Sequence, residues 1–245
     1  MPQQLLTIKK NIQIAEQTYM MELEGDTSTI MNPGQFINIQ ISGCFLRRPM
    51  SIAKWDENSL TIMYRIVGSG TKRLSEYTYD TELDCLVGLG NGFDISKAVD
   101  KRVLFIGGGL GTAPLIGLAR ELKKNSEKID AVIGFGEKKY IIGEKELNNY
   151  CNNVSVVTLD GSYGIKGLPT DIVDVSKYDY YFTCGPENML KAVHKLNIAG
   201  QLSFEARMGC GFGACMGCSC RTLSGYKRIC VEGPVMYSSE VSFDD

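Results

Sequence analysis

The chain has 245 residues, of which 26 are Lys or Arg and 28 are Asp or Glu, so its formal net charge is −2. Apolar residues make up 44% and charged residues 22%, which is enough to bury a core and excludes wholesale disorder. The near-neutral charge gives no electrostatic basis for nucleic acid or an anionic membrane as partners, and the single histidine excludes a multi-His metal site.

The nine cysteines are the unusual feature of the composition. The clustered ones are Cys210, Cys215, Cys218, Cys220 and Cys230, and the scattered ones are Cys44, Cys85, Cys151 and Cys184. A secreted disulfide scaffold would spread its cysteines and usually follow a signal peptide, whereas residues 1–17 are polar without an apolar core. We therefore expect a cytoplasmic protein whose cysteines are reduced or bound to metal.

Residues 1–98 are predicted to form short antiparallel strands. The segments are rich in Ile, Val, Thr and Tyr, often alternate in polarity, and are separated by turn residues. This pattern predicts a small antiparallel barrel, interrupted by one helix at residues 71–77. The expected strands cover residues 5–15, 18–25, 34–41, 59–68 and 82–90.

Near residue 100 the pattern changes to strands that alternate with helices. The uncharged segment 103–119 is too short and too rich in glycine for a membrane span, and fits a buried strand, a glycine turn and the start of a helix that ends near residue 124. This alternation predicts βαβ units and a doubly wound parallel sheet. Further strands are expected at residues 131–135, 154–159 and 180–183, and further helices at 144–150 and 187–196.

The cysteine-rich segment after residue 202 has the spacing of an iron–sulfur site. Cys210, Cys215, Cys218 and Cys230 give C-x4-C-x2-C-x11-C, and this arrangement is the plant-type [2Fe–2S] signature. Intervening glycines permit tight turns and let peptide N–H groups point at the sulfurs. Structural zinc is the alternative, but it would need a second C-x2-C pair or histidines. Cys220 could replace Cys218, although the C-x2-C spacing favours Cys218 and leaves Cys220 as a free thiol.

Loops at the predicted strand ends indicate a nucleotide site. The glycine turn at residues 107–111 joins a buried strand to a helix, where backbone N–H groups can face a phosphate, although such a turn can also serve packing alone. Residues 160–164 and 183–186 follow two further strands at the same edge. Glu137 could bind a ribose or be a solvated loop carboxylate. The candidate nucleotide contacts are Gly107, Gly108, Gly109, Gly111, Cys184, Gly185 and Pro186.

Two cationic motifs lie in the barrel region. Residues 46–52 read L-R-R-P-M-S-I, in which two arginines, a rigid proline and a small hydroxyl suit a pyrophosphate and a planar ring. Residues 63–65 supply another cationic strand, and the glycine turn at 68–72 a second phosphate cradle. Surface charge on barrel strands is the alternative for each motif.

Together these motifs resemble the ferredoxin–NADP reductase superfamily, in which an FAD-binding barrel precedes a nucleotide domain. The flavin motif of that superfamily is R-x-[YF]-S, and here Met50 stands at the aromatic position. R-P-x-S with a C-terminal [2Fe–2S] module resembles one branch, the electron-transfer subunits of NAD-dependent dihydroorotate dehydrogenase B. The resemblance spans essentially the whole chain, and E-x-R-M-G-C-G-x-G-A-C, from Glu205, is its most specific motif.

The resemblance implies an FAD-binding β-barrel over residues 1–98, an NAD-binding Rossmann-like domain over 99–201 and a [2Fe–2S] module over 202–245. It implies an oxidoreductase of pyrimidine biosynthesis that works with an FMN-containing dihydroorotate dehydrogenase catalytic subunit, in a heterotetramer with two of each. Electrons would pass through the cluster and FAD to NAD+, with no side chain as general acid or base. The implied FAD contacts are Arg48, Pro49, Met50, Ser51, Met63, Tyr64, Arg65, Gly70 and Thr71, and the implied cluster ligands are Cys210, Cys215, Cys218 and Cys230.

Two other functions fit the same motifs. The small FAD/[2Fe–2S] subunit of an NADH-dependent ferredoxin–NADP oxidoreductase, or of a sulfide- or sulfite-type oxidoreductase, would share the order of modules. A nucleotide-binding regulator stapled by zinc would have no redox activity.

Overall fold

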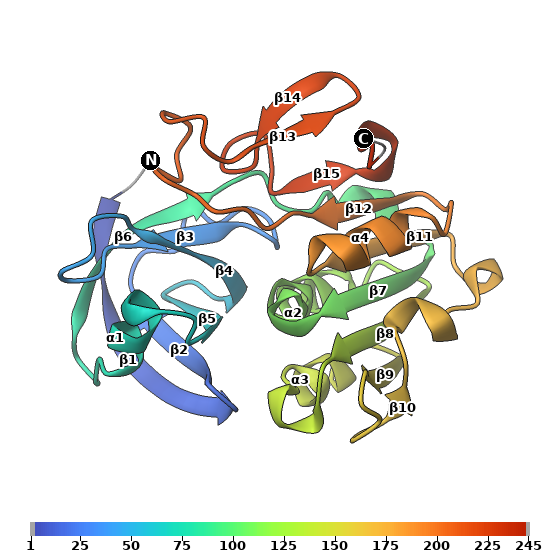
Figure 1. Cartoon of the computed structure of the whole chain (residues 1–245), viewed down its shortest axis with the longest axis horizontal. Coiled ribbons are helices and arrows are strands. Elements are labelled where there is room, and N and C mark those ends of the chain that lie inside the picture. The colour runs from blue at the N-terminus through green and yellow to red at the C-terminus, as the bar shows by residue number, and fades with distance from the viewer. Residues whose placement is uncertain (1–2, 244–245) are drawn as a thin grey trace.

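The computed structural model describes residues 3–243, whose first part is a closed antiparallel barrel (Figure 1). Its strands follow the order β1-β2-β5-β4-β3-β6, and α1 (Ser69–Ser75) lies between β5 and β6 in the chain. The confirmed barrel contains one strand that the sequence suggested only as a motif, β4. The six strands are β1 (Gln3–Ala15), β2 (Thr18–Glu24), β3 (Phe36–Ile39), β4 (Arg48–Trp55), β5 (Ser59–Arg65) and β6 (Glu82–Leu89).

The second part is a seven-stranded sheet in the order β10-β9-β8-β7-β11-β12-β15, parallel except for β15. It confirms the predicted combination of a barrel with an α/β domain. Its strands are β7 (Arg102–Gly108), β8 (Lys128–Phe135), β9 (Asn153–Thr158), β10 (Ile165–Lys166), β11 (Tyr180–Cys184), β12 (Gly200–Ser203) and β15 (Val235–Tyr237). Its helices are α2 (Thr112–Leu122), α3 (Glu144–Asn148) and α4 (Glu187–His194), and 3-10 turns occupy Ile95–Ala98, Gly109–Gly111, Lys138–Tyr140, Pro169–Ile172, Val175–Lys177 and Ser238–Glu240.

Strand β4 tolerates its proline because of where the missing N–H would point. The N–H of Ile52 donates to the carbonyl of Gln35, the residue before β3. Successive residues of a strand direct their N–H groups to opposite sides, so the backbone nitrogen of Pro49 points away from β3. On that side β5 leaves the first half of β4 unpaired, and Pro49 therefore costs no ladder hydrogen bond.

Helix α2 joins the two parts of the molecule. A Cβ placed on Gly117 would lie 2.7 Å from the carbonyl oxygen of Ala53, so the helix backbone packs directly on β4. Arg120 at the end of the same helix donates to the carbonyl of Trp55 (2.6 Å) and lies over its ring. The packing holds the glycine turn before α2 next to the strand that carries the R-R-P-M-S motif.

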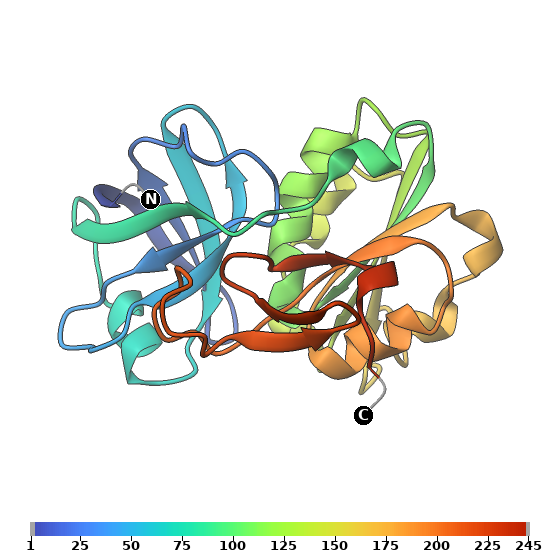
Figure 2. The ribbon, with the colours of Figure 1, turned by 90° about the horizontal axis from the view of Figure 1, so that it is seen from above.

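The C-terminal segment lies across the junction of barrel and sheet, as Figures 1 and 2 show from two directions. It contains the hairpin of β13 (Ser219–Thr222) and β14 (Gly225–Arg228), and then returns as β15 to pair with β12. The proposed second and third domains therefore share one sheet. Within residues 3–243 no helix has both the length and the apolar character needed to cross a membrane.

Candidate functional site

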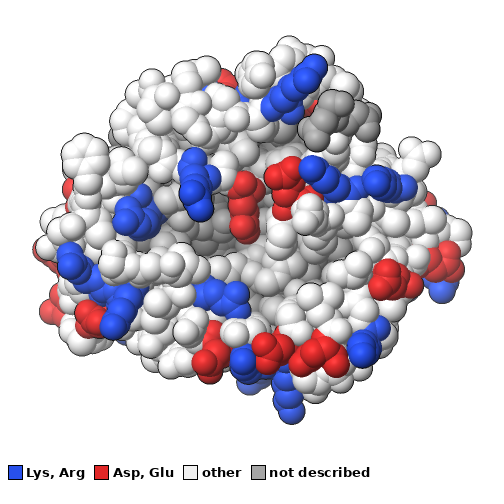
Figure 3. Space-filling model, viewed as in Figure 1, with Lys and Arg blue, Asp and Glu red and all other residues white. Residues whose placement is uncertain are grey.

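A cavity of about 290 Å³ lies between the barrel strands β4 and β5 and residues 203–206. We call it the flavin cavity. On the face shown in Figure 3 the molecule is hollowed between barrel and sheet, with charged side chains of both signs around the hollow. The structure brings eight of the nine expected FAD contacts to this cavity. They are Arg48, Pro49, Met50, Ser51, Met63, Tyr64, Arg65 and Thr71.

The flavin cavity exists because β4 and β5 separate. The two strands pair from Trp55 opposite Leu60 to Ile52 opposite Ile62, and the pairing ends there. Beyond this point β4 continues along β3 while β5 continues along β2. The backbone edges left open between them can hydrogen-bond to a planar polar ring.

The two adjacent arginines of the motif point to different surroundings. Arg47 donates to the carboxylate of Asp84 (2.9 Å) and to its backbone carbonyl (2.9 Å), and this side-chain hydrogen bond lowers the pKa of the Asp84 carboxyl. Arg48 lines the cavity, where a Cβ on Gly70 would lie 2.9 Å from its Nε. Gly70, the ninth expected FAD contact, thus lets the start of α1 approach the guanidinium. Arg48 is the cation of the pair that a bound anion can reach.

Tyr64 lines the flavin cavity, although its side chain is packed in the core of the barrel. Its ring is buried, stacks on Tyr19 at 5.7 Å between centroids, and its hydroxyl donates to Asn11 (2.8 Å). Burial raises the pKa of the Tyr64 phenol. The ring therefore stays neutral and fixes the strand that faces the cavity.

A second cavity, of about 380 Å³, lies at the carboxyl ends of the parallel strands, and we call it the nucleotide cavity. Gly108 and Gly109 of the glycine turn line it together with Pro186, residues 134–136 and Leu159. Ligands of open α/β sheets bind at this edge, outside the ends of the strands. The cavity is therefore placed where a dinucleotide is expected.

The remaining glycines near this edge permit close packing. A Cβ on Gly107 would lie 2.9 Å from the hydroxyl of Thr112, and one on Gly111 would lie 2.2 Å from the carbonyl oxygen of Cys184. Gly185 has a φ of +157° and packs against the glycine turn. These positions hold β7, α2 and β11 together behind the nucleotide cavity.

The two cavities adjoin. Arg65 and Leu110 line both of them, and the guanidinium of Arg65 lies 4.2 Å from the centre of the Tyr140 ring, which lines the nucleotide cavity. A ligand bound in the nucleotide cavity that extends past Leu110 would therefore reach the flavin cavity. Cys184 also lines the flavin cavity, and burial raises the pKa of its thiol.

Glu137, a candidate for binding ribose, faces a lysine. Its carboxylate pairs with Lys139 at 3.1 Å, and both side chains are about half exposed. The neighbouring residue Lys138 donates its N–H to Ser162 in the loop after β9 (2.8 Å). This arrangement fits the alternative, a solvated carboxylate in a loop.

The four expected cluster ligands are arranged as two pairs. The N–H of Cys210 donates to the sulfur of Cys215 (3.4 Å), and the N–H of Cys230 donates to that of Cys218 (3.5 Å). Desolvation opposes ionisation of Cys210, but N–H groups of Phe212 and the following loop hold its pKa at about 6. Two pairs of cysteine sulfurs, each met by peptide N–H groups, fit a cluster of two irons, which takes four thiolate ligands.

Cys220 lies apart from these pairs. Its sulfur contacts the sulfur of Met236 (4.0 Å), and desolvation raises the pKa of its thiol. Among residues 3–243 no three side chains of His, Cys, Asp or Glu converge on a position for one metal ion. Cys210, Cys215, Cys218 and Cys230 supply four thiols, which is the number of ligands that a [2Fe–2S] cluster takes.

Asn38 is a residue of the site that the sequence interpretation missed. It lies on β3 opposite Pro49 of the flavin motif, and its amide donates to the carbonyl of Cys210 (2.9 Å). The side chain is 1% exposed, and its own carbonyl oxygen has no hydrogen-bond partner. A polar amide in the otherwise apolar strand F-I-N-I was the available signal. Asn38 ties the cysteine loop to the barrel.

The barrel, the parallel sheet and the two adjoining cavities define a flavin- and nicotinamide-dependent reductase of the ferredoxin–NADP reductase class. The structure of an NADH-dependent reduced ferredoxin–NADP oxidoreductase is similar, with a TM-score of 0.86 and 28% identity over 98% of this chain and 91% of that one. A ferredoxin NADP+ reductase from Neisseria gonorrhoeae shares the fold, with a TM-score of 0.67 and 13% identity over 79% of this chain and 89% of that one.

Residues 205–242 match the model of the iron–sulfur cluster binding domain of dihydroorotate dehydrogenase B. The electron transfer subunit of dihydroorotate dehydrogenase B (NAD(+)) from Fusobacterium nucleatum is 39% identical, over 97% of this chain and 98% of that protein. The corresponding subunit of Clostridium perfringens is 38% identical, over 96% of each. The chain belongs to the family of dihydroorotate dehydrogenase B (NAD(+)) electron transfer subunits, and the resemblance seen in the sequence is confirmed.

Proposed function

We propose that the chain carries electrons from the FMN of a dihydroorotate dehydrogenase catalytic subunit to NAD+, in a cytoplasmic heterotetramer with two copies of each subunit. Family membership supports FAD, NAD and a [2Fe–2S] cluster as its cofactors and pyrimidine biosynthesis as its setting. The family name, electron transfer subunit, supports a catalytic partner.

The succession of the three sites carries this proposal. The nucleotide cavity shares Arg65 and Leu110 with the flavin cavity. Met208, two residues before Cys210, lines the flavin cavity. Asn38, which lies on β3 opposite Pro49, donates a hydrogen bond to the carbonyl of Cys210. FAD supplies the exchange between the two-electron chemistry of nicotinamide and the one-electron chemistry of an iron–sulfur cluster. Such an exchange requires the FAD site to lie between the nucleotide cavity and the cluster ligands.

The protein's own groups bind and orient in this scheme. Arg48 would meet the pyrophosphate of FAD, because it is the cation directed into the flavin cavity. Gly108 and Gly109 would let the backbone approach the NAD phosphates. Cys184, kept as a neutral thiol by burial, would position the nicotinamide against the flavin.

The partner is tested by affinity purification of the tagged chain from its own cells. We expect an FMN-containing protein to co-purify, and the complex to reduce NAD+ when supplied with dihydroorotate. Recovery of a larger subunit rich in iron–sulfur clusters would instead indicate that the chain is the small subunit of a ferredoxin–NADP oxidoreductase. The structural similarity to such an enzyme is the observation that favours this second candidate.

Replacing Arg48 by alanine should weaken FAD binding by about 10- to 100-fold, because a charge-assisted hydrogen bond contributes about 1.5–3 kcal/mol. Titration of the apoprotein with FAD, followed by quenching of flavin fluorescence, measures the effect. Arg47→Ala is the matched control, since Arg47 pairs with Asp84 instead. Equal losses of FAD affinity in both variants would contradict the assignment of Arg48.

A further inference from the structure

We propose that Arg228 and Glu232 form a charge pair that sets the reduction potential of the cluster, with Arg228 also positioning the loop between Cys210 and Cys215. The inference rests on the proposed function only in that Cys210, Cys215, Cys218 and Cys230 hold the cluster. It concerns two residues that no motif of the sequence singled out.

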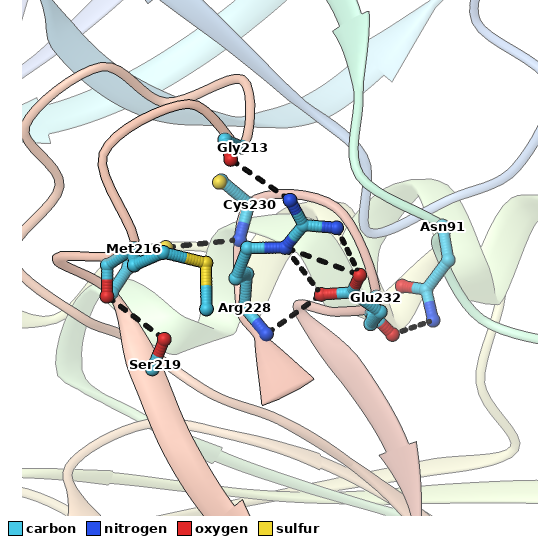
Figure 4. A network of polar contacts seen from close by, with 8 residues as sticks. Asn91, Gly213, Met216, Ser219, Arg228, Cys230 and Glu232 are labelled. Carbon is cyan, nitrogen blue, oxygen red and sulfur yellow. Dashed lines mark hydrogen bonds and ion pairs between the residues drawn. The ribbon is translucent and has the colours of Figure 1, made fainter. Parts of the chain in front are cut away.

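The guanidinium of Arg228 is fixed on both sides. Arg228 ends β14, and its Nη1 donates to the carbonyl of Gly213 (2.8 Å), inside the loop between Cys210 and Cys215. Its Nε donates to both carboxylate oxygens of Glu232 (3.0 and 3.2 Å), and its Nη2 donates to one of them. Figure 4 shows the guanidinium between Gly213 and Cys230 on one side and the Glu232 carboxylate on the other.

The loop is shaped to receive this side chain. Gly213 has a φ of +94°, a conformation that favours glycine, and a Cβ there would lie 3.1 Å from Nη1 of Arg228 and 2.6 Å from a methyl group of Val231. Only a residue without a side chain lets the loop and the guanidinium approach this closely. Arg228 thereby fixes the segment between two of the proposed ligands.

The pair is also held from the barrel side. The amide of Asn91 donates to the carbonyl of Glu232 (3.2 Å) and to that of Val235 (2.7 Å). The N–H of Arg228 itself donates to the Glu232 carboxylate (2.7 Å). Both charges are therefore held at fixed positions next to Cys230, which lies between them in the chain.

The sign of each charge determines its effect. The Arg228 guanidinium lies beside Cys230, as Figure 4 shows, and its hydrogen bond to Gly213 holds it against the loop between Cys210 and Cys215. Reduction adds one negative charge to a cluster that four thiolates already make negative, so a nearby positive charge favours the reduced state. Glu232 opposes this effect. Both side chains are only partly exposed, 29% for Arg228 and 37% for Glu232, so solvent screens them incompletely.

The test is a redox titration of the cluster-loaded holoprotein, followed by electron paramagnetic resonance. Arg228→Gln should shift the cluster potential downward, and Glu232→Gln should shift it upward, although both break the same ion pair. Arg228→Lys keeps the positive charge, so its cluster potential should stay close to that of the unchanged protein. Arg102→Gln is the matched control, because it breaks a similar two-point pair with Asp179 at the start of β7 and should cause no shift.

Opposite shifts support the proposal, whereas shifts of the same sign, or none in either variant, would show a structural role alone. If Arg228→Gln loses its iron, Glu232→Gln decides: an upward shift supports the proposal and an unchanged potential overturns it. A [2Fe–2S] signal missing from the unchanged protein would contradict the proposed function itself, which keeps the two failures distinct.

Discussion

Replacement of Cys215 by serine should leave a yellow protein that holds flavin but almost no iron. Cys215 is the most exposed of the four proposed ligands, and its sulfur accepts hydrogen bonds from the N–H groups of Cys210 and Gly217. A serine hydroxyl is a hard, weakly acidic donor and replaces a soft thiolate poorly. Iron should fall from about two atoms per chain to nearly none, as expected for loss of a [2Fe–2S] cluster. Iron analysis and visible absorption measure this.

The matched control is Cys220→Ser. Cys220 is five residues from Cys215 in the chain, but its sulfur faces Met236. This variant should keep both its iron and its [2Fe–2S] absorption. Iron loss from Cys220→Ser, or an intact cluster in Cys215→Ser, would require a different set of ligands.

Gly111→Ala should destabilise the protein by about 3 kcal/mol or more, the upper end of what overpacking costs. The new Cβ would lie 2.2 Å from the carbonyl oxygen of Cys184 and 2.6 Å from the nitrogen of Gly185. Both are backbone atoms, so the start of α2 has to move away from the end of β11. Because the glycine turn moves with it, we also expect NADH to bind at least about ten-fold more weakly, the equivalent of about 1.4 kcal/mol.

Urea denaturation and titration with NADH measure the two effects of this substitution. Gly136→Ala provides the comparison for stability, because a Cβ there has no neighbour within 4 Å and its φ lies outside the left-handed region. Its free energy of unfolding should change by less than about 0.5 kcal/mol. If Gly111→Ala were as stable as Gly136→Ala, the close contact between α2 and β11 would be wrong.

The sequence allowed most of the fold to be predicted, because the barrel strands alternate and the parallel strands are continuous apolar runs. Among the strands that it did not reveal are β12 and β15. These strands have four and three residues, too few for a periodic pattern, and their pairing joins Gln201 to Tyr237 across the cysteine segment. Strand β4 was hidden by Pro49, which normally argues against a strand. The domain boundaries stay a prediction.

In the candidate site too, some residues could be predicted from the sequence and others could not. The cysteines could be assigned because ligands of one cluster lie within one short segment, where spacing carries the information. Asn38 and Cys210 are 172 residues apart, and the amide of one becomes a partner of the other only in the folded chain. Arg228 and Glu232 are close in sequence, but their relation to Gly213 depends on the loop conformation. Spacing alone therefore predicted the ligands and not the residues that support them.

The pairing of β15 with β12 attaches the cysteine-rich segment to the seven-stranded sheet. Asn91 and Asn38 bind it to the barrel region as well. A redox group on a flexible tether has to diffuse between its donor and its acceptor, and its turnover falls as solvent viscosity rises. Here the proposed relay is built into the framework, so we expect the electron to cross a constant separation without a domain swing, and turnover to be insensitive to viscosity.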